Sequence, residues 1–330
     1  MFIKIKNFFK ENYKFLLVLI LIVVFFNIRL PYYIMAPGGT IDVTDRVLMD
    51  DYEKSSKGSL NMLYVSEYKA TPASLLLAKL KNWDIDKNEE RQVSDESAAD
   101  IEKRNKIMRD NSLNIATLVA YKEAQKEITI TEKRNVVIAT TIDNGLEIGD
   151  IILEADGQVC EDIETVKKII SNKEVDDDIT FKIIRDDKEK LVRSKVILDN
   201  NTKVIGVVII TEYDYNKNPE VDIKFKDSES GASGGLMLSL TIYNAISGED
   251  IIKGRNIAGT GTISVDGTVG EIDGIKYKIM GAAHDGMDIV LVPENNYEEA
   301  IRTKNTYNFD IEIVKVNTFK EAINYLKNFE

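Results

Sequence analysis

The sequence predicts an α+β protein with a single N-terminal transmembrane helix. Three patterns lead to this prediction: an apolar run near the N-terminus, strand-like alternation over residues 128–198, and alternating strand and helix patterns from residue 202 onward. With 330 residues, the chain is long enough for two modest domains that each have a hydrophobic core. Its net charge of −12 argues against a nucleic-acid partner, because phosphates would repel an acidic surface.

The transmembrane helix is predicted at residues 13–33, after a cytoplasmic tail of residues 1–12. Residues 15–26 are all apolar. The longer segment would extend about 31 Å as a helix, which matches the hydrocarbon thickness of a bilayer. Lysines precede it, so the positive-inside rule places the N-terminus in the cytoplasm and the rest of the chain outside the cell. The alternative is a cleaved signal peptide, but residues 34–36 form a poor cleavage site.

Residues 34–127 are predicted to be a connecting region of strands and helices. A strand is expected at residues 60–65, and helices are expected near residues 71–83 and 95–125. Residues 84–105 are rich in charged side chains and are interpreted as a solvated face or a spacer.

Residues 128–198 carry the motif LEIGDII at residues 146–152, followed by a turn at Asp156-Gly157. Strands are expected around it, with an amphipathic helix over residues 162–170. This order and this motif resemble a PDZ domain. The resemblance implies that an extended peptide binds as an added strand beside the helix. The usual glycine-rich carboxylate loop is not evident upstream, so recognition of a terminal carboxylate is not implied, and a spacer without a ligand is the alternative.

Residues 202–330 alternate between strand and helix patterns. Strands are expected at residues 205–211, 221–225, 257–265, 289–292 and 311–316. Helices are expected at residues 236–245, 274–283 and 318–329. This alternation predicts an α/β layer.

Two residues in this half have the chemistry of a nucleophile and a base. Ser233 lies in the run SGASGG at residues 230–235, directly before an apolar helix, where a substrate can reach a hydroxyl. Lys278 shares a helix face with three apolar residues, because their spacing is i, i+3, i+4 and i+7: Ile275, Ile279 and Ala282. A lysine on an apolar face loses hydration, and its pKa falls toward the range in which it acts as a base.

Further motifs lie around these two residues. They are AGTGTI at residues 258–263, GTVGEIDGIKYK at residues 267–278 and VLVPEN at residues 290–295. These motifs resemble the proteolytic domain of Lon-type peptidases over roughly residues 226–300. Together with the N-terminal segment and the PDZ-like domain, the chain is similar to the membrane-anchored PDZ–Lon peptidases of Gram-positive bacteria.

The resemblance implies that Ser233 is the nucleophile and that Lys278 is the general base. Helix spacing favours the same lysine, since Lys276 lies off the apolar face and is expected to be solvated. Thr260 matches a threonine of the family, so it is expected to hydrogen-bond to Lys278 and orient it. The nucleophile loop lacks the proline common in the family, and Asp273 stands where a glycine is usual. A degenerate, inactive copy is therefore the alternative.

The chain has a single histidine, His284, and a single cysteine, Cys160, which exclude several other kinds of site. No zinc site with two histidines and no intrachain disulfide can form. His284 is expected at the surface and Cys160 in a small apolar site. No metal or other cofactor is expected. The sequence also has no Gly-x4-Gly-Lys-Ser/Thr loop, so the enzyme is expected to work without ATP.

Together, these patterns predict a membrane-anchored, ATP-independent serine endopeptidase that uses a Ser233–Lys278 dyad. Its expected substrates are extracytoplasmic peptides or small membrane proteins. The PDZ-like domain of residues 128–198 would bind or gate them, and the Lon-type domain of residues 202–330 would cut them on the outer side of the cell membrane. The alternative is an inactive extracytoplasmic scaffold that binds peptides, which a solvent-exposed Lys278 far from Ser233 would favour.

Overall fold

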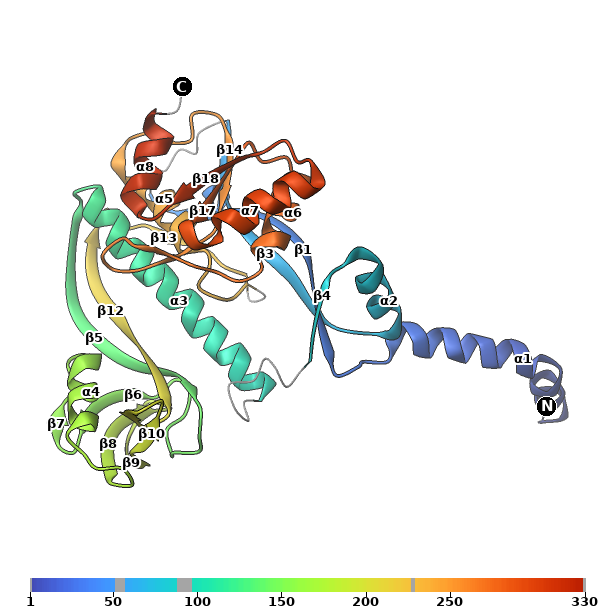
Figure 1. The fold of residues 1–330 in the computed structure, drawn as a ribbon, viewed down its shortest axis with the longest axis horizontal. Coiled ribbons are helices and arrows are strands. Elements are labelled where there is room, and N and C mark those ends of the chain that lie inside the picture. The colour runs from blue at the N-terminus through green and yellow to red at the C-terminus, as the bar shows by residue number, and fades with distance from the viewer. Residues whose placement is uncertain (1, 51–56, 88–96, 227–228, 329–330) are drawn as a thin grey trace. The chain divides into compact units, whose positions relative to one another are not determined.

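The computed structural model describes residues 2–50, 57–87, 97–226 and 229–328 (Figure 1). The chain forms two compact units, each built from two stretches of sequence. The first unit comprises residues 1–38 and 65–92, and the second comprises residues 39–64 and 93–330.

The first unit combines two helices with parts of three strands. They are α1 (Phe2–Asn27), the beginning of β1 (Tyr32–Asp42), the end of β3 (Ser59–Lys69), α2 (Pro72–Lys81) and β4 (Asp84–Lys87). Strand β1 pairs antiparallel with β4. Helix α2 begins as its sequence predicts, because Thr71 forms a capping box with Ser74 and Pro72 occupies the first turn. The small core contains the fully buried side chains of Ile34 and Ala78.

The N-terminal helix ends earlier in the chain than the sequence predicted. It ends at Asn27, and the amide of Leu30 donates a hydrogen bond to the Ala70 carbonyl, so residues 13–33 are not one helix. Its unbroken apolar part, residues 15–26, extends about 18 Å, well short of the roughly 30 Å of a bilayer core. No helix in the described parts of the chain is long and apolar enough to cross a membrane. The predicted transmembrane helix, and the single-pass location with an extracellular catalytic part, are therefore wrong.

The second unit contains a sheet with the strand order β18-β17-β14-β3-β1. Strands β14 (Asn256–Gly259), β17 (Ile289–Pro293) and β18 (Glu312–Val316) run parallel, and β14 also runs parallel to β3. Strand β17 is buried on both faces, as its continuous apolar sequence predicts. Short strands complete this part of the fold: β2 (Val47–Leu48), β13 (Asp222–Ile223), β15 (Thr262–Ile263) and β16 (Val269–Gly270).

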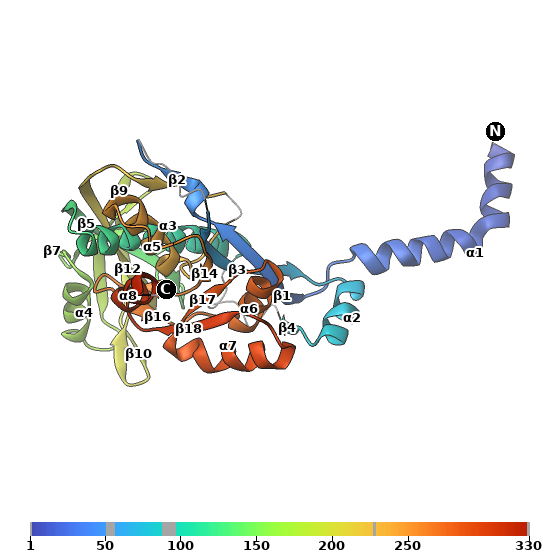
Figure 2. The ribbon, with the colours of Figure 1, turned by 90° about the horizontal axis from the view of Figure 1, so that it is seen from above.

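Helices cover both faces of this sheet (Figure 2). Helices α5 (Gly235–Ser247) and α8 (Phe319–Asn328) pack on one face, in a core that includes Leu291. Helices α6 (Ile275–His284) and α7 (Glu294–Tyr307) pack on the other, in a core that includes Val290 and Val292. Consecutive strand residues thus face opposite helix layers, and the predicted alternation of strands and helices is confirmed.

The PDZ-like part is an antiparallel sheet with the strand order β12-β5-β6-β8-β9. Its strands are β5 (Glu127–Thr140), β6 (Ile151–Ala155), β7 (Gln158–Val159), β8 (Asp178–Arg185), β9 (Lys188–Lys195) and β12 (Val207–Asn218). The short strand β7 pairs with β6. Strands β10 (Ile197–Asp199) and β11 (Thr202–Val204) form a separate hairpin. The predicted amphipathic helix is α4 (Ile163–Ser171), which buries Val166 and Ile170 against Phe181.

Helix α3 (Ala98–Glu123) lies beside the long β5–β12 ribbon and also packs against α5 (Figure 1). Its C-terminal half is part of the main core, where Ala116, Ala120 and Tyr121 are fully buried. Part of the charged segment 84–105 lies outside the described residues. In its described part, residues 84–87 form β4 and the Asn105 carbonyl accepts a hydrogen bond from the Gly231 amide, so the interpretation as a solvated face or spacer does not hold at these positions.

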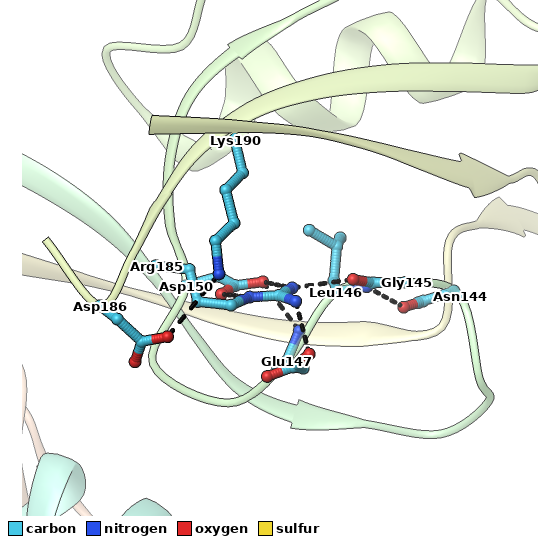
Figure 3. A network of polar contacts seen from close by, with 8 residues as sticks. All are labelled: Asn144, Gly145, Leu146, Glu147, Asp150, Arg185, Asp186 and Lys190. Atoms are coloured by element: carbon cyan, nitrogen blue, oxygen red, sulfur yellow. Dashed lines mark hydrogen bonds and ion pairs between the residues drawn. The ribbon is translucent and has the colours of Figure 1, made fainter. Parts of the chain in front are cut away.

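A polar network fixes the LEIGDII turn of the PDZ-like part (Figure 3). Arg185 on β8 forms two hydrogen bonds with the carboxylate of Asp150, at 2.7 and 2.6 Å. It also donates to the Gly145 carbonyl at 2.8 Å and pairs with Glu147. Asp150 is only 1% exposed, and the Arg185 guanidinium is its cationic partner. The paired carboxylates raise the pKa of the Arg185 guanidinium, chiefly through the hydrogen bonds with Asp150.

We expect Arg185→Ala to destabilise the PDZ-like part by about 3–5 kcal/mol, because it leaves Asp150 buried without a cationic partner. Two measurements report this loss: the hydrogen exchange of the β6 and β8 amides, and the free energy of unfolding in urea. Lys190→Ala is the matched control, since Lys190 forms an exposed pair with Asp186 at 3.7 Å and should cost less than about 1 kcal/mol. Equal exchange in the two variants would show that the Arg185 network does not stabilise the domain.

Candidate active site

Ser233 lies in the turn that precedes α5, and it is half-buried. Gly231 begins this turn with φ +90°, a conformation that glycine adopts without strain. Helix α3 holds the turn at two points. The Gly231 amide donates to the Asn105 carbonyl at 3.1 Å, and the Ser112 hydroxyl donates to the Ala232 carbonyl at 3.1 Å. The loop that lacks the family proline is thus held by hydrogen bonds from α3.

Sequence reasoning missed this support from α3. Arg109 donates to the Glu229 carbonyl at 3.0 Å, and Arg46 forms an ion pair with the Glu229 side chain just before the loop. Asn105, Arg109 and Ser112 follow an i, i+4, i+7 spacing, which places them on one helix face. That spacing is the only signal in the sequence that could have indicated their shared role.

Thr260 lies beneath the same loop, because strand β14 breaks there. The predicted strand over residues 257–265 is wrong at this point: β14 ends at Gly259, and β15 begins at Thr262. The Gly261 amide donates to the Ser233 carbonyl at 2.8 Å, and the Thr260 hydroxyl donates to the same carbonyl at 3.1 Å. A Cβ atom on Gly261 would lie 2.7 Å from a Val269 methyl, so a larger residue does not fit.

Lys278 occupies the apolar face of α6 as predicted, and only 3% of it is exposed. Its Nζ donates a hydrogen bond to Thr260 Oγ1 at 2.9 Å. Burial lowers the pKa of Lys278 to about 8, and the charge of Asp273 opposes this shift. Lys276 is half-buried rather than fully solvated, and its Nζ donates to the Tyr277 hydroxyl at 3.3 Å.

The structure therefore joins all three predicted residues. The Thr260 hydroxyl accepts from Lys278 and donates to the Ser233 carbonyl, so one side chain links the helix with the lysine to the loop with the serine. This arrangement links a buried amine with a lowered pKa, through one threonine side chain, to the loop that carries Ser233. An amine of this kind has the chemistry of a general base at neutral to mildly alkaline pH.

The single histidine and the single cysteine lie outside this cluster. The side chain of His284 is 85% exposed and pairs with Asp285 at 3.0 Å. Cys160 is buried, and burial raises the pKa of its thiol. Over the described residues, no group of three or more His, Cys, Asp or Glu side chains is arranged to hold a metal ion.

The predicted peptide site of the PDZ-like part would lie along helix α4. Strand β12, an edge strand of the sheet, contacts this helix. Val207 and Ile209 of β12 are partly buried against the core to which α4 contributes. An edge strand presents unpaired backbone groups to which an extended peptide can add. The binding of a peptide there stays a prediction.

Two parts of the chain match known protein families. Residues 210–327 match the family described as the Lon protease C-terminal proteolytic domain, and residues 109–196 match the PDZ domain family. The first match includes Ser233, Thr260 and Lys278. A Lon-type proteolytic domain together with a PDZ domain supports a serine peptidase as the class of protein.

Individual relatives agree with this class. The chain is 31% identical over 98 residues to a Lon protease of Neorickettsia sennetsu and 31% identical over 106 residues to an archaeal Lon protease of Halobacterium salinarum. These segments are 30% and 32% of this chain but only 12% and 15% of the relatives. The PDZ domain of an SdrC-like protein from Listeria innocua is 26% identical, with a TM-score of 0.22, over 23% of this chain and 92% of that domain. A score this low does not establish a shared fold.

Proposed function

We propose that this protein is a serine endopeptidase in which Ser233 is the nucleophile and Lys278 is the general base. The observation that carries the proposal is the burial of Lys278, with a pKa of about 8, next to Thr260 and the Ser233 loop. An ordinary lysine, with a pKa of about 10.4, is neutral in only about one molecule in 2,500 at pH 7. With a pKa of about 8, roughly one in ten is neutral.

The proposed reaction has two stages. Neutral Lys278 accepts the proton of the Ser233 hydroxyl as Oγ bonds to the carbonyl carbon of the scissile peptide. The tetrahedral intermediate then collapses, the carbon–nitrogen bond breaks, and Lys278 returns the proton to the departing amine. Lys278 then accepts a proton from water as the water oxygen attacks the ester carbon. The carbon–oxygen bond to Ser233 breaks, Lys278 returns the proton to Ser233 Oγ, and the acid product is released.

The start of α5 is suited to stabilise the oxyanion of this intermediate. The Gly235 amide donates to the Ala232 carbonyl at 3.3 Å, and the Leu236 amide donates to the Gly261 carbonyl at 3.1 Å. The amides of Ser233 and Gly234 come directly before these two in the chain, and we assign the binding of the oxyanion to them. The positive end of the α5 dipole favours the same charge.

Flexible peptides are the proposed substrates, and cleavage is proposed to need no ATP. The sequence has no phosphate-binding Gly-x4-Gly-Lys-Ser/Thr loop, so the chain supplies no such means of unfolding a stable protein. The PDZ-like part would present the peptide in extended form along the edge of β12 that does not pair with β5.

The full chain tests the proposal directly. It should cleave an unstructured peptide at equal rates with and without ATP, and a fluorophosphonate should label Ser233, as located by mass spectrometry. The inactive-scaffold alternative predicts peptide binding without cleavage and without labelling. A rate that depends on ATP would overturn the ATP-independent part alone.

A further inference from the structure

A small apolar cavity lies directly beside the Ser233 loop. Its volume is about 140 Å³, and Ala232, the neighbour of Ser233, forms part of its wall. Ile263 of β15 and two side chains of α3, Met108 and Ile115, line it further. A cavity of roughly 150 Å³ accommodates a group the size of benzene. This one therefore has room for a branched aliphatic side chain.

The PDZ-like sheet closes the same cavity. Ile138 of β5 and Ile210 of β12 both line it. Side chains alternate between the two faces of a strand, and Val207 and Ile209 pack into the PDZ-like core. Ile210 therefore points away from that core, toward α3 and the Ser233 loop. Strand β12, to whose edge a peptide would add, therefore also lines the cavity beside the Ser233 loop.

One polar group in the cavity wall lacks a partner. Asn111 lines the cavity, and its Oδ1 is buried without any hydrogen-bond donor. A buried acceptor in this state is unfavourable until a donor reaches it. A peptide substrate carries such donors in its backbone N–H groups. The cavity therefore offers an apolar space and one acceptor, which suits a peptide that inserts an aliphatic side chain.

We propose that this cavity is the specificity pocket, which holds the leucine-like side chain of the substrate residue whose carbonyl Ser233 attacks. Asn111 Oδ1 accepts a hydrogen bond from a backbone N–H of that substrate. This proposal rests on the peptidase function proposed above. It adds that the PDZ-like sheet, through Ile138 and Ile210, helps determine which bond is cut.

Binding tests the pocket independently of catalysis. In the full chain carrying Ser233→Ala, calorimetry compares acetylated tripeptides that end in leucine amide or glycine amide. We expect the leucine peptide to bind at least about tenfold more tightly, since small differences in apolar size give discrimination of this order. Adding Ile210→Phe fills the cavity and should reduce the ratio to within about threefold. Val208→Phe is the matched control, because Val208 is 46% exposed on the same strand and should leave the ratio unchanged.

A second variant and a labelling control separate the possible outcomes. Asn111→Leu should weaken both peptides, because it removes the acceptor for their backbone. In the chain with Ser233 intact, Ile210→Phe should lower kcat/KM for the leucine substrate more than for the glycine substrate, while Val208→Phe should leave both values and the rate of fluorophosphonate labelling unchanged. Equal leucine preference in the Ile210→Phe and Val208→Phe variants overturns the pocket, even if cleavage occurs. Leucine-selective binding without cleavage or labelling overturns the peptidase function, and with it the role of the cavity in choosing the cleaved bond, but it keeps the cavity as a site that binds a leucine side chain.

Discussion

Replacing Ser233 with alanine should abolish peptide cleavage, with a loss of at least about 10⁴-fold in kcat. The reason is chemical, since the Ser233 hydroxyl is the group that forms the ester with the substrate in the proposed reaction. Alanine removes only the hydroxyl, and the hydrogen bonds from the Thr260 hydroxyl and the Gly261 amide to the carbonyl of residue 233 remain available. The measurement is the turnover of an unstructured peptide, followed by chromatography of the products.

Binding distinguishes loss of chemistry from loss of structure in this variant. The Ser233→Ala protein should bind substrate as tightly as the wild type does, and α5 should show the same hydrogen-exchange protection. Ser230→Ala is the matched control, because it removes a hydroxyl from the same loop and should keep most of the activity. Undiminished turnover by Ser233→Ala would assign the nucleophile elsewhere.

The residues that sequence patterns predict well are those that depend on local spacing. Lys278 is buried because i, i+3 and i+4 positions of one helix face the same core, and this geometry needs no knowledge of the rest of the fold. The position of Ser233 before an apolar helix is equally local. Linked motifs in a fixed order then identify both residues through a resemblance to Lon-type peptidases.

Non-local contacts explain most of what sequence patterns miss. The break in the strand at Thr260 depends on a close approach between Gly261 and Val269, which lies on another strand. The contacts of α3 with the Ser233 loop, and the approach of Ile210 to Ala232, join segments that are far apart in the chain. No periodic pattern in a single sequence encodes such contacts.

The membrane prediction fails for a different reason. A hydropathy average counts apolar residues without regard to the backbone conformation. Apolar side chains continue past Asn27 toward Tyr33, so the average extends the predicted helix to that point. The helix does not continue, because the chain leaves it before Pro31 and enters strand β1. The residue at which the helix ends is therefore what composition alone places too far along the chain.

Replacing Lys278 with methionine should lower kcat by about 10²–10⁴, the usual contribution of a general base. Methionine has a similar length and suits an apolar environment, so the packing against Ile275 and Ile279 is retained. Lys276→Met is the matched control, since Lys276 is half-buried on the same helix and should be dispensable for the reaction. Equal losses in the two variants would reject the assignment of the base.

The pH profile gives this assignment a second, independent test. Because the pKa of Lys278 is about 8, the neutral, active form increases from roughly a tenth at pH 7 to about nine-tenths at pH 9. The rate in the wild type should therefore rise nearly tenfold over this range. Asp273 raises the pKa of Lys278, so Asp273→Asn should move the midpoint to lower pH and make the enzyme faster at pH 7. A flat profile, or a shift in the opposite direction, contradicts a lysine base, because only a group that must lose its proton gives this sign.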